Sequence, residues 1–387
     1  MAKLRIAVIA GEESGELLAA DLIRSLKEAS GRDIELIGVG GSHLAALGLQ
    51  SLFPSGDIAL MGVTAVLRDL PRLYRRIGTT AKAIAEAKPD CLITVDSPEF
   101  TLRVAKKVRT ANKNISIAHY VCPSVWAWRQ GRAAEMRPYV DHILCLLPFE
   151  PTELARLGGP PGSFVGHRLS SDPSALNAAK QQSRPRALSA DREKTLLLLP
   201  GSRRGEVRAL LEPFRETVDL LTARGAKLNL LLPTVPHVEP IIRAATANWR
   251  TPPKIVTSTE EKWQAFGAAD AAICASGTVS LELALADVPT VSCYKLDPVA
   301  RLARHLVKTW TIVLPNLIAD RPVVRDFIDF MVIPAMLARQ LEALMNDTAL
   351  RKWQKDGFAE VRERMATPQP AGKLAARVVL DLITHDK

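Results

Sequence analysis

The chain has 387 residues, of which 47% are hydrophobic and 24% charged, and its formal net charge is +10. This length exceeds what one hydrophobic core usually organises, and no apolar run is long enough to span a bilayer, so we expect two ordinary globular domains and at most peripheral membrane contact. The excess of positive charge favours an anionic partner, which leaves nucleic acid, phosphorylated small molecules and an anionic membrane leaflet as candidates.

Short β-rich runs alternate with longer helical patterns from the first residues onward, which is typical of βαβ units that build a mostly parallel sheet. The predicted strands of this part are residues 4–10, 34–39, 91–95, 116–121 and 142–146. We therefore predict a first α/β domain over residues 1–170.

The alternation stops at a polar, Ser/Ala/Arg-rich stretch, which we interpret as an interdomain linker over residues 171–194 with some local helix. It restarts in a second α/β domain, residues 195–333, and residues 334–387 are expected to be helical. The predicted strands are 195–199, 228–232, 254–256, 271–274 and 290–294. We expect two doubly wound parallel-sheet domains facing a cleft, the architecture called GT-B, with a helical C-terminal tail that packs on either domain or on a neighbouring subunit.

Ligands of such sheets bind beyond the carboxyl ends of the strands, and the first predicted strand ends there in a glycine turn. Gly11 and Gly15 permit a tight turn, after which the amides of a new helix face the ligand. Glu12 and its acidic neighbours would repel phosphate, so a sugar hydroxyl is the expected ligand. Ser14 either contacts that ligand or only caps the helix.

Residues 61–77 combine apolar side chains with four arginines. This basic amphipathic pattern predicts either contact with a membrane surface or a helix whose apolar face joins the core. A second stretch with similar composition, residues 301–310, gives weaker support for membrane contact.

Asp96 follows the third predicted strand and precedes a helix that starts with Pro98. A carboxylate in this place faces the cleft with little freedom, which favours a catalytic or ligand-binding role. The alternative is a helix-capping aspartate, although Ser97 is better placed to cap.

The stretch 120–132 places Trp126 and Trp128 beside Arg129 and Arg132. Indole faces next to guanidinium groups are suited to stacking on nucleic-acid bases while binding phosphate. A second interpretation is the wall of a glycolipid site, in which an arginine contacts a phosphate and the indoles contact sugar or acyl surface. Core packing of at least one indole stays open.

The opening strand of the second domain leads into a turn that contains Ser202 and Arg203. This turn lacks the GxxxxGK[ST] pattern of a nucleotide-hydrolysing phosphate loop. Arg203 would supply permanent hydrogen-bond donors to a diphosphate and stabilise the charge of a leaving group. The alternative is a solvated basic turn.

A later strand leads into Ser276, Gly277 and Thr278, and Glu282 follows one turn into a helix. The small residues let a diphosphate approach the helix amides. The glutamate is placed to bind two vicinal ribose hydroxyls. Together these features predict a nucleotide site.

The five cysteines are far apart and lie mostly within apolar runs, so we expect buried free thiols in a reducing cytoplasm. No CxxC or HxxxH spacing occurs, and we therefore predict no metal site and no cofactor. Activity is expected to be metal-independent.

Nine ordered motifs resemble the lipid-A-disaccharide synthase family over almost the whole chain. They are AGEESGE, MGVTAVL, DSPEF, YVCPSVWAWR, LPFE, FVGH, LLPGSR, ASGTVSLE and LPNLI. The resemblance implies a GT-B glycosyltransferase of lipid A biosynthesis in Gram-negative bacteria. It would join UDP-2,3-diacylglucosamine to 2,3-diacylglucosamine 1-phosphate by inversion, forming a β-1,6-linked disaccharide 1-phosphate and releasing UDP.

The resemblance also implies roles for particular residues and a cellular setting. Asp96 is the implied general base, and Arg203, Glu282 and Asn316 are implied donor-site residues, with Ser14 in a turn facing the donor. The family further implies a homodimer that exchanges its C-terminal helices and works on the cytoplasmic face of the inner membrane, in contact with anionic lipid. The chain departs from the usual family pattern at Glu16, Arg168, Arg325, Asp326 and Asp329.

Two other functions remain as alternatives. A UDP-sugar epimerase would share the two domains and the UDP site but need no acceptor. An RNA-binding protein would use the basic surface and residues 120–132, and its affinity would depend steeply on salt. The carboxylates at the strand ends argue against this second alternative, and we expect no nucleic-acid partner.

Overall fold

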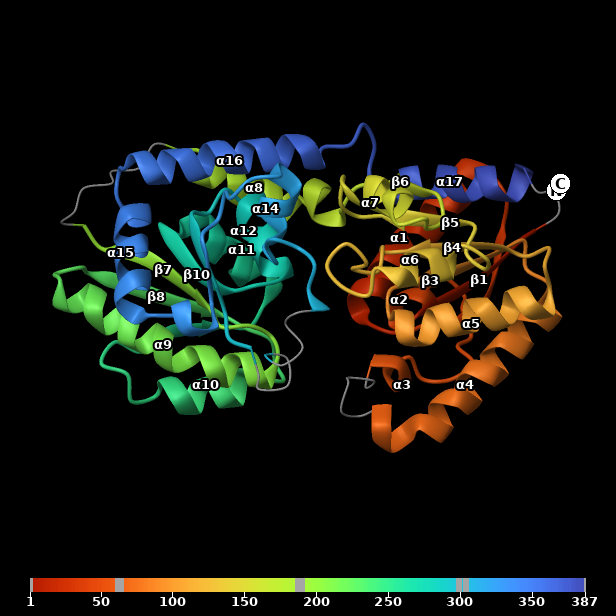
Figure 1. Ribbon diagram of the computed structural model, residues 1–387, viewed down its shortest axis with the longest axis horizontal. Coiled ribbons are helices and arrows are strands. Elements are labelled where there is room, and N and C mark those ends of the chain that lie inside the picture. Colours follow the sequence, from red (N-terminus) through yellow and green to blue (C-terminus); the bar gives the residue numbers. More distant parts are fainter. Residues whose placement is uncertain (1–2, 60–65, 185–191, 297–300, 302–305, 386–387) are drawn as a thin grey trace. The chain divides into compact units, whose positions relative to one another are not determined.

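The computed structural model describes residues 3–59, 66–184, 192–296, 301 and 306–385 (Figure 1). The chain forms two compact units, Met1–Arg168 with Thr367–Lys387, and Leu169–Ala366. Each unit contains a six-stranded sheet in which all strands are parallel, with helices on both faces. The predicted α/β architecture with two doubly wound sheets and a helical C-terminal region is therefore confirmed.

The sheet of the first unit has the strand order β2-β1-β3-β4-β5-β6. Alternate side chains of β1 enter two separate cores. Ile6 and Val8 pack against α1 and α17, whereas Ala7 and Ile9 pack toward α4 and α5. The elements are β1 (Leu4–Ala10), α1 (Glu13–Ser30), β2 (Ile34–Val39), α2 (Ser42–Ala45), α3 (Gly56–Ala59), α4 (Val66–Ala87), β3 (Cys91–Val95), α5 (Pro98–Ala111), β4 (Ser116–Tyr120), α6 (Gly131–Met136), β5 (His142–Cys145), α7 (Glu150–Arg156), β6 (Gly162–Phe164) and α17 (Ala371–His385).

The sheet of the second unit has the order β12-β11-β10-β7-β8-β9. Leu196 and Leu198 of its central strand, with Ile273 of the next, join a core that α9 and α15 complete. The elements are α8 (Pro173–Gln182), β7 (Lys194–Leu199), α9 (Arg204–Ala223), β8 (Leu228–Pro233), α10 (Glu239–Thr246), β9 (Lys254–Val256), α11 (Thr259–Ala268), β10 (Ala271–Ala275), α12 (Thr278–Leu285), β11 (Thr290–Tyr294), α14 (Leu314–Ala319), β12 (Asp326–Ile328), α15 (Pro334–Met345) and α16 (Ala349–Met365).

Every predicted strand is present, with ends that agree to within one residue. The sequence did not predict β6 and β12. Each has three residues, which is too short for a period-two pattern to be recognised. Both lie at sheet edges, where pairing to one neighbour is enough to define them.

The compact units are bounded differently from the predicted domains. The predicted linker contains α8, whose side chain Gln182 donates through Nε2 to the carbonyl oxygens of Phe266 and Ala269, both at 2.7 Å. These bonds attach α8 to α11 of the second unit. The C-terminal region is also divided, since α15 and α16 pack on the second unit and α17 packs on α1 of the first. Exchange of these helices between subunits stays a prediction.

The five cysteines are free and buried, which confirms the expectation for the thiols. Among the described residues, no helix combines the length and apolar character needed to cross a bilayer.

The strand order of each sheet contains one point where successive connections turn in opposite directions. In the first unit it lies between β1 and β3, and in the second between β7 and β10. Helices leave these strand pairs toward opposite faces, so the carboxyl ends of the pair frame a crevice. Glu12, Ser14, Gly15 and Asp96 lie at the first of these points. Ser202, Arg203, Ser276, Gly277, Thr278 and Glu282 lie at the second.

Candidate active site

The glycine turn after β1 and Asp96 after β3 are neighbours at the carboxyl edge of the first sheet. Ala10 pairs with Val95 in the parallel ladder, so the next residue of each strand starts its loop side by side with the other. Gly15 is buried, and a Cβ there would lie 3.4 Å from the Cγ1 atom of Val95. The first turn of α1 is thereby held close to the end of β3.

Ser14 is an exposed residue in the first turn of α1, and Glu12 occupies the N-cap position without a side-chain capping bond. The capping alternative for Ser14 is therefore wrong, because a cap must precede the first helical residue. The hydroxyl of Ser14 and the carboxylate of Glu12 both lie on the exposed surface of this turn.

The backbone around Asp96 has an uncommon conformation. Asp96 and Ser97 have φ values of 48° and 45°, and Val121, after the neighbouring strand β4, has a φ of 75°. Positive φ is costly for a β-branched residue and persists only where the surroundings enforce it. Here the Asp96 amide donates to the Tyr120 carbonyl at 2.9 Å, and the Thr101 hydroxyl donates to the Asp96 carbonyl at 2.6 Å.

Burial raises the pKa of the Asp96 carboxyl above its ordinary value of 3.8, and a hydrogen bond from the Ser97 amide opposes part of this shift. A carboxylate with a raised pKa holds a proton more strongly once it accepts one. Ser97 is the N-cap residue of α5, so the aspartate side chain is not used for capping. Asp96 is thus a candidate general base.

The two tryptophans of the loop after β4 have different surroundings. The Trp126 ring packs edge-on against Phe149 with 5.4 Å between centroids, and its indole nitrogen is buried. Trp128 is 42% exposed, and the Arg129 guanidinium lies 4.5 Å from its ring centroid. Trp126 is therefore a half-buried side chain that packs on Phe149, whereas Trp128 is presented to solvent.

Glu99 of α5 organises the arginines around this loop. Its carboxylate forms ion pairs with Arg129 at 2.9 Å, with Arg103 at 3.3 Å and with Arg132. Although burial opposes ionisation, the three guanidinium groups lower the pKa of Glu99. Three positive groups and one negative group leave a net charge of +2 beside the exposed face of Trp128.

The second unit contains a cavity of about 350 Å³ at the carboxyl ends of β7 and β10. All six predicted residues of its two turns line this cavity. The lining residues are Leu199, Gly201, Ser202, Arg203, Glu206, Pro233, Thr234, Val235, Lys262, Ala275, Ser276, Gly277, Thr278, Val279 and Glu282.

The Arg203 side chain is 81% exposed and forms an ion pair with Glu206 at 2.9 Å. The same glutamate accepts a hydrogen bond from the Arg203 amide at 3.3 Å, which fixes the start of α9. Gly201 has a φ of 107°, and a Cβ there would lie 2.6 Å from Oε2 of Glu206. This turn requires glycine, and it leaves Arg203 at the edge of the cavity and exposed to solvent.

The start of α12 forms another side of the cavity. Gly277 has a φ of 142°, a conformation that side chains rarely adopt, and it precedes the first helical residue, Thr278. The Ser276 amide donates to the Cys293 carbonyl at 2.9 Å, and its hydroxyl donates to the Ile312 carbonyl at 3.3 Å. These bonds hold the turn while the first amides of the helix stay available to an anion.

Lys262 is a cavity residue that the sequence did not reveal. Its ammonium lies 3.0 Å from both carboxylate oxygens of Glu282, and 4.9 Å from the ring centroid of Trp263. It comes from α11, which carries no recognisable motif, and only the packing of α11 beside β7 brings it to the cavity. The predicted ribose ligand Glu282 is therefore held in one orientation by a cation.

Asn316 does not line this cavity and is 1% exposed. Its Oδ1 accepts from the amides of Val323 and Val324 at 2.8 and 2.7 Å, and its Nδ2 donates to the Val324 carbonyl at 2.8 Å. In this conformation the side chain joins α14 to the segment before β12. The structure does not bring Asn316 to the other predicted donor residues.

The two predicted membrane stretches differ in what the structure shows of them. Within residues 61–77, Leu73 and Ile77 are buried in the core, whereas Tyr74 is 56% exposed. Arg72 and Arg76 form ion pairs with Asp57, so one face of this helix joins the core and the other faces solvent. Residues 61–65 lie outside the described part of the chain, as do the side chains of residues 66–70.

Near the other stretch, several large apolar side chains are exposed, and three of them are exposed over more than half of their surface. They are Leu306, Trp310 and Phe330, with exposed fractions of 52%, 56% and 78%. Arg301 forms an ion pair with Asp329, which links the two segments that carry these side chains. Exposed apolar side chains are therefore present in both segments of the second unit.

Comparison with known proteins identifies relatives over almost the full length. Residues 6–376 match the family model described as lipid-A-disaccharide synthetase. The lipid-A-disaccharide synthase of Rhodopseudomonas palustris (strain HaA2) is 43% identical over 387 residues, which is 98% of this chain and 96% of that protein. The corresponding enzyme of Nitrobacter winogradskyi is 42% identical, over 99% of this chain and 96% of its own.

Solved structures with the same fold have much lower identity. The crystal structure of Acinetobacter baumannii MurG has a TM-score of 0.59 and 17% identity, over 99% of this chain and 100% of that chain. The S. aureus MnaA–UDP co-structure has a TM-score of 0.63 and 12% identity, over 98% of both chains. At these identities the likeness concerns the fold alone.

Proposed function

Because this chain belongs to the lipid-A-disaccharide synthase family and is a glycosyltransferase of lipid A biosynthesis, we propose that it transfers a diacylglucosaminyl group from UDP-2,3-diacylglucosamine to 2,3-diacylglucosamine 1-phosphate. The products are a β-1,6-linked disaccharide 1-phosphate and UDP. The observation that carries the substrate proposal is the cavity at β7 and β10, where a carboxylate, a helix N-terminus and an arginine surround one space.

The cavity provides separate groups for the parts of a nucleoside diphosphate. Glu282, oriented by Lys262, accepts hydrogen bonds from the two ribose hydroxyls. The amides at the start of α12 and the Arg203 guanidinium face the diphosphate, with the hydroxyls of Ser202 and Thr278 beside them. Positive charge and oriented amides stabilise the UDP leaving group as the glycosidic bond breaks.

The acceptor is proposed to bind at the first unit. Inversion requires its 6-hydroxyl to attack the anomeric carbon opposite the departing UDP, and Asp96 takes the proton of that hydroxyl as the bond forms. The raised pKa of Asp96 suits this role better than that of an ordinary exposed aspartate. Ser14 and Glu12, on the neighbouring turn, supply hydroxyl and carboxylate groups for sugar hydroxyls.

The acceptor's 1-phosphate is proposed to bind the net positive cluster of Arg103, Arg129 and Arg132. Glu99 holds these arginines in place without neutralising them, and two guanidinium groups remain in excess. The exposed face of Trp128 lies directly beside this charge and offers an apolar surface to sugar or acyl groups.

We also propose that the protein works in the cytoplasm on the inner face of the inner membrane, as a homodimer. The exposed apolar side chains Leu306, Trp310 and Phe330, with the basic residues Arg301 and Lys308 nearby in sequence, support contact with anionic lipid. Flotation with vesicles that contain anionic phospholipid measures this contact. Failure to co-float at low salt would exclude it.

One assay tests the substrates. Purified protein is mixed with both diacylated glucosamine substrates, and mass spectrometry detects disaccharide 1-phosphate and UDP. Omitting the acceptor distinguishes transfer from epimerisation, because an epimerase converts the UDP-sugar alone. We expect product only when both substrates are present, and activity that persists in EDTA. Product formation without acceptor would refute the proposal.

A further inference from the structure

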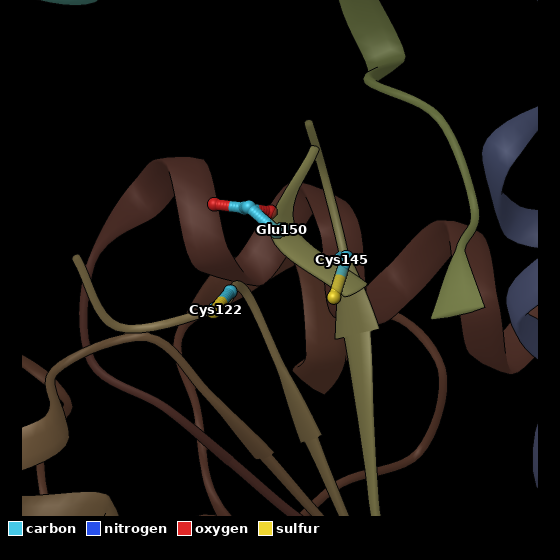
Figure 2. A group of neighbouring side chains, drawn as sticks. All are labelled: Cys122, Cys145 and Glu150. Atoms are coloured by element: carbon cyan, nitrogen blue, oxygen red, sulfur yellow. The ribbon is translucent and has the colours of Figure 1, made fainter. Parts of the chain in front are cut away.

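Three potential metal ligands meet inside the first unit, and none of them has a role in the site described above. Cys122 follows β4, Cys145 ends β5 and Glu150 begins α7 (Figure 2). One ligand atom from each lies within 4.8 Å of the others, and all three residues are buried. No sequence pattern indicates this cluster, because the residues come from three different elements and form no CxxC motif.

The cluster is unusual because Glu150 is a buried acidic residue, 3% exposed. The donors of its geometric hydrogen bonds are backbone amides and not a basic side chain. Oε2 of Glu150 accepts from the amides of Leu146 and Leu147, both at 3.0 Å. Because Oε2 accepts both amide bonds, we take Oε1 as the ligand atom, although the Trp126 side chain also interacts with this carboxylate. Burial raises the pKa of this carboxyl to about 7, and hydrogen bonds from the Leu147 amide, the Trp126 side chain and the Leu146 amide oppose part of the shift.

We propose that Cys122, Cys145 and Glu150 bind one thiophilic divalent cation, with Zn²⁺ as the best fit, through two thiolates and one carboxylate oxygen. Zinc binds sulfur at about 2.3 Å and carboxylate oxygen at about 2.0–2.2 Å, with tetrahedral geometry. Ligand atoms of such a site are roughly 3.5–3.8 Å apart, so the observed atoms need to approach by at most about an ångström. The fourth position is left for water.

The charges also favour a divalent cation. Two thiolates and one carboxylate together carry three negative charges, which a buried site tolerates only beside a compensating cation. A thiol must lose its proton to bind the cation. Metal binding therefore releases protons.

The site has a structural consequence for the loop described above. Cys122 starts the segment that continues to Trp126 and Arg132, and Trp126 packs on Phe149, which immediately precedes Glu150. A bound cation would connect Cys122, at the start of this segment, and Glu150, next to Phe149, to Cys145 of β5. The expected effect is a more stable loop, with no part in the chemistry of transfer.

The test uses Co²⁺ as a probe in the full-length protein, reduced and freed of metal beforehand. Binding is expected to produce a near-ultraviolet band from thiolate-to-cobalt charge transfer, with one ion per chain, and Zn²⁺ is expected to displace Co²⁺. Cys122→Ser and Cys145→Ser should remove the band, and Glu150→Gln should weaken Co²⁺ binding at least tenfold. Absence of the band in the wild-type protein would overturn the proposal.

A second thiol pair provides a matched control. Cys274 and Cys293 are buried on the adjacent strands β10 and β11, where Ala275 pairs with Cys293. The double variant Cys274→Ser/Cys293→Ser should retain the band. If the band follows this pair instead, the assignment is wrong. X-ray absorption of the Zn²⁺-loaded wild-type protein, which should show two sulfur neighbours, decides the question even if a cysteine variant fails to fold.

Discussion

The ammonium of Lys262 lies 3.0 Å from each carboxylate oxygen of Glu282, so one cation orients the group that we assign to the donor ribose. The two residues come from α11 and α12, on either side of β10. Both are largely buried, with side-chain exposed fractions of 26% and 17%. Both residues line the cavity that we assign to the donor.

Replacing Glu282 by Gln is expected to weaken the binding of UDP and of uridine by a similar factor. A hydrogen bond to a charged acceptor contributes about 1.5–3 kcal/mol, so the expected loss is roughly 10- to 100-fold in Kd. Isothermal titration calorimetry measures both ligands. Glu260→Gln, on the exposed side of α11, is the control and should bind normally. A loss confined to UDP would assign Glu282 to the diphosphate instead.

Asp96→Asn is expected to lower kcat by about 10²- to 10⁴-fold, the usual contribution of a general base, with a small change in KM for either substrate. The substitution preserves the size of the side chain, and the positive φ of Asp96 is tolerated by asparagine. Circular dichroism checks the fold, and Asp33→Asn at an exposed surface position is the control. Wild-type turnover in Asp96→Asn would exclude this residue as the base.

The pH dependence of kcat/KM should follow the raised pKa of Asp96. The base must be ionised, so activity falls as the pH drops, with a midpoint above the ordinary value of 3.8. The folded chain also keeps this proton to a higher pH than the unfolded chain does. Ionisation therefore lowers the stability of the fold as pH rises from 3.8 through the raised pKa. The residual activity of Asp96→Asn should not show this fall of kcat/KM at low pH. If the fall is unchanged by the substitution, it reports the ionisation of another group.

Arg129→Ala and Arg132→Ala are expected to raise KM for diacylglucosamine 1-phosphate by roughly 10-fold or more, because each loses a charge-assisted hydrogen bond to phosphate. UDP affinity should stay unchanged, since the cluster and the UDP cavity use different residues. An acceptor analogue without the phosphate should respond little to either substitution. Arg137→Ala, exposed just after α6, is the control. Equal effects on both acceptors would indicate a role in loop structure only.

Asn316→Ala is expected to lower the free energy of unfolding by about 2–5 kcal/mol, because the buried amides of Val323 and Val324 lose their acceptor. Urea denaturation measures this change, with the exposed Asn248→Ala as the control. A variant with normal stability but weakened UDP binding would instead support direct contact between Asn316 and the donor.

Much of the fold could be predicted from the sequence because the relevant signals are local. Apolar strands such as 91–95 and 271–275 are bounded by helical patterns, and each is followed by small or acidic residues. Parallel strands place such ends at one edge of a sheet, so Asp96 and Ser276 could be assigned to crevices before the strand order was known. The nine ordered motifs extended this to the family.

Other features depend on contacts between distant residues and left no local pattern. The predicted linker contains α8 because Gln182 bonds to backbone more than 80 residues away along the chain. Lys262 reaches the cavity through the packing of α11, and Asn316 turns inward because two amides before β12 need an acceptor. The cluster of Cys122, Cys145 and Glu150 likewise exists only where separate elements meet.

The sequence by itself therefore determined the two α/β units, the strand ends at which we propose the site, and the family, because periodicity or contiguous motifs indicate each of them. Tertiary structure alone decided which side chains stabilise the fold and which are exposed at the candidate sites. The physical reason is that burial and ion pairing join residues of different elements. Trp126 and Trp128, two positions apart, illustrate this, because one packs on Phe149 and the other stays exposed beside Arg129.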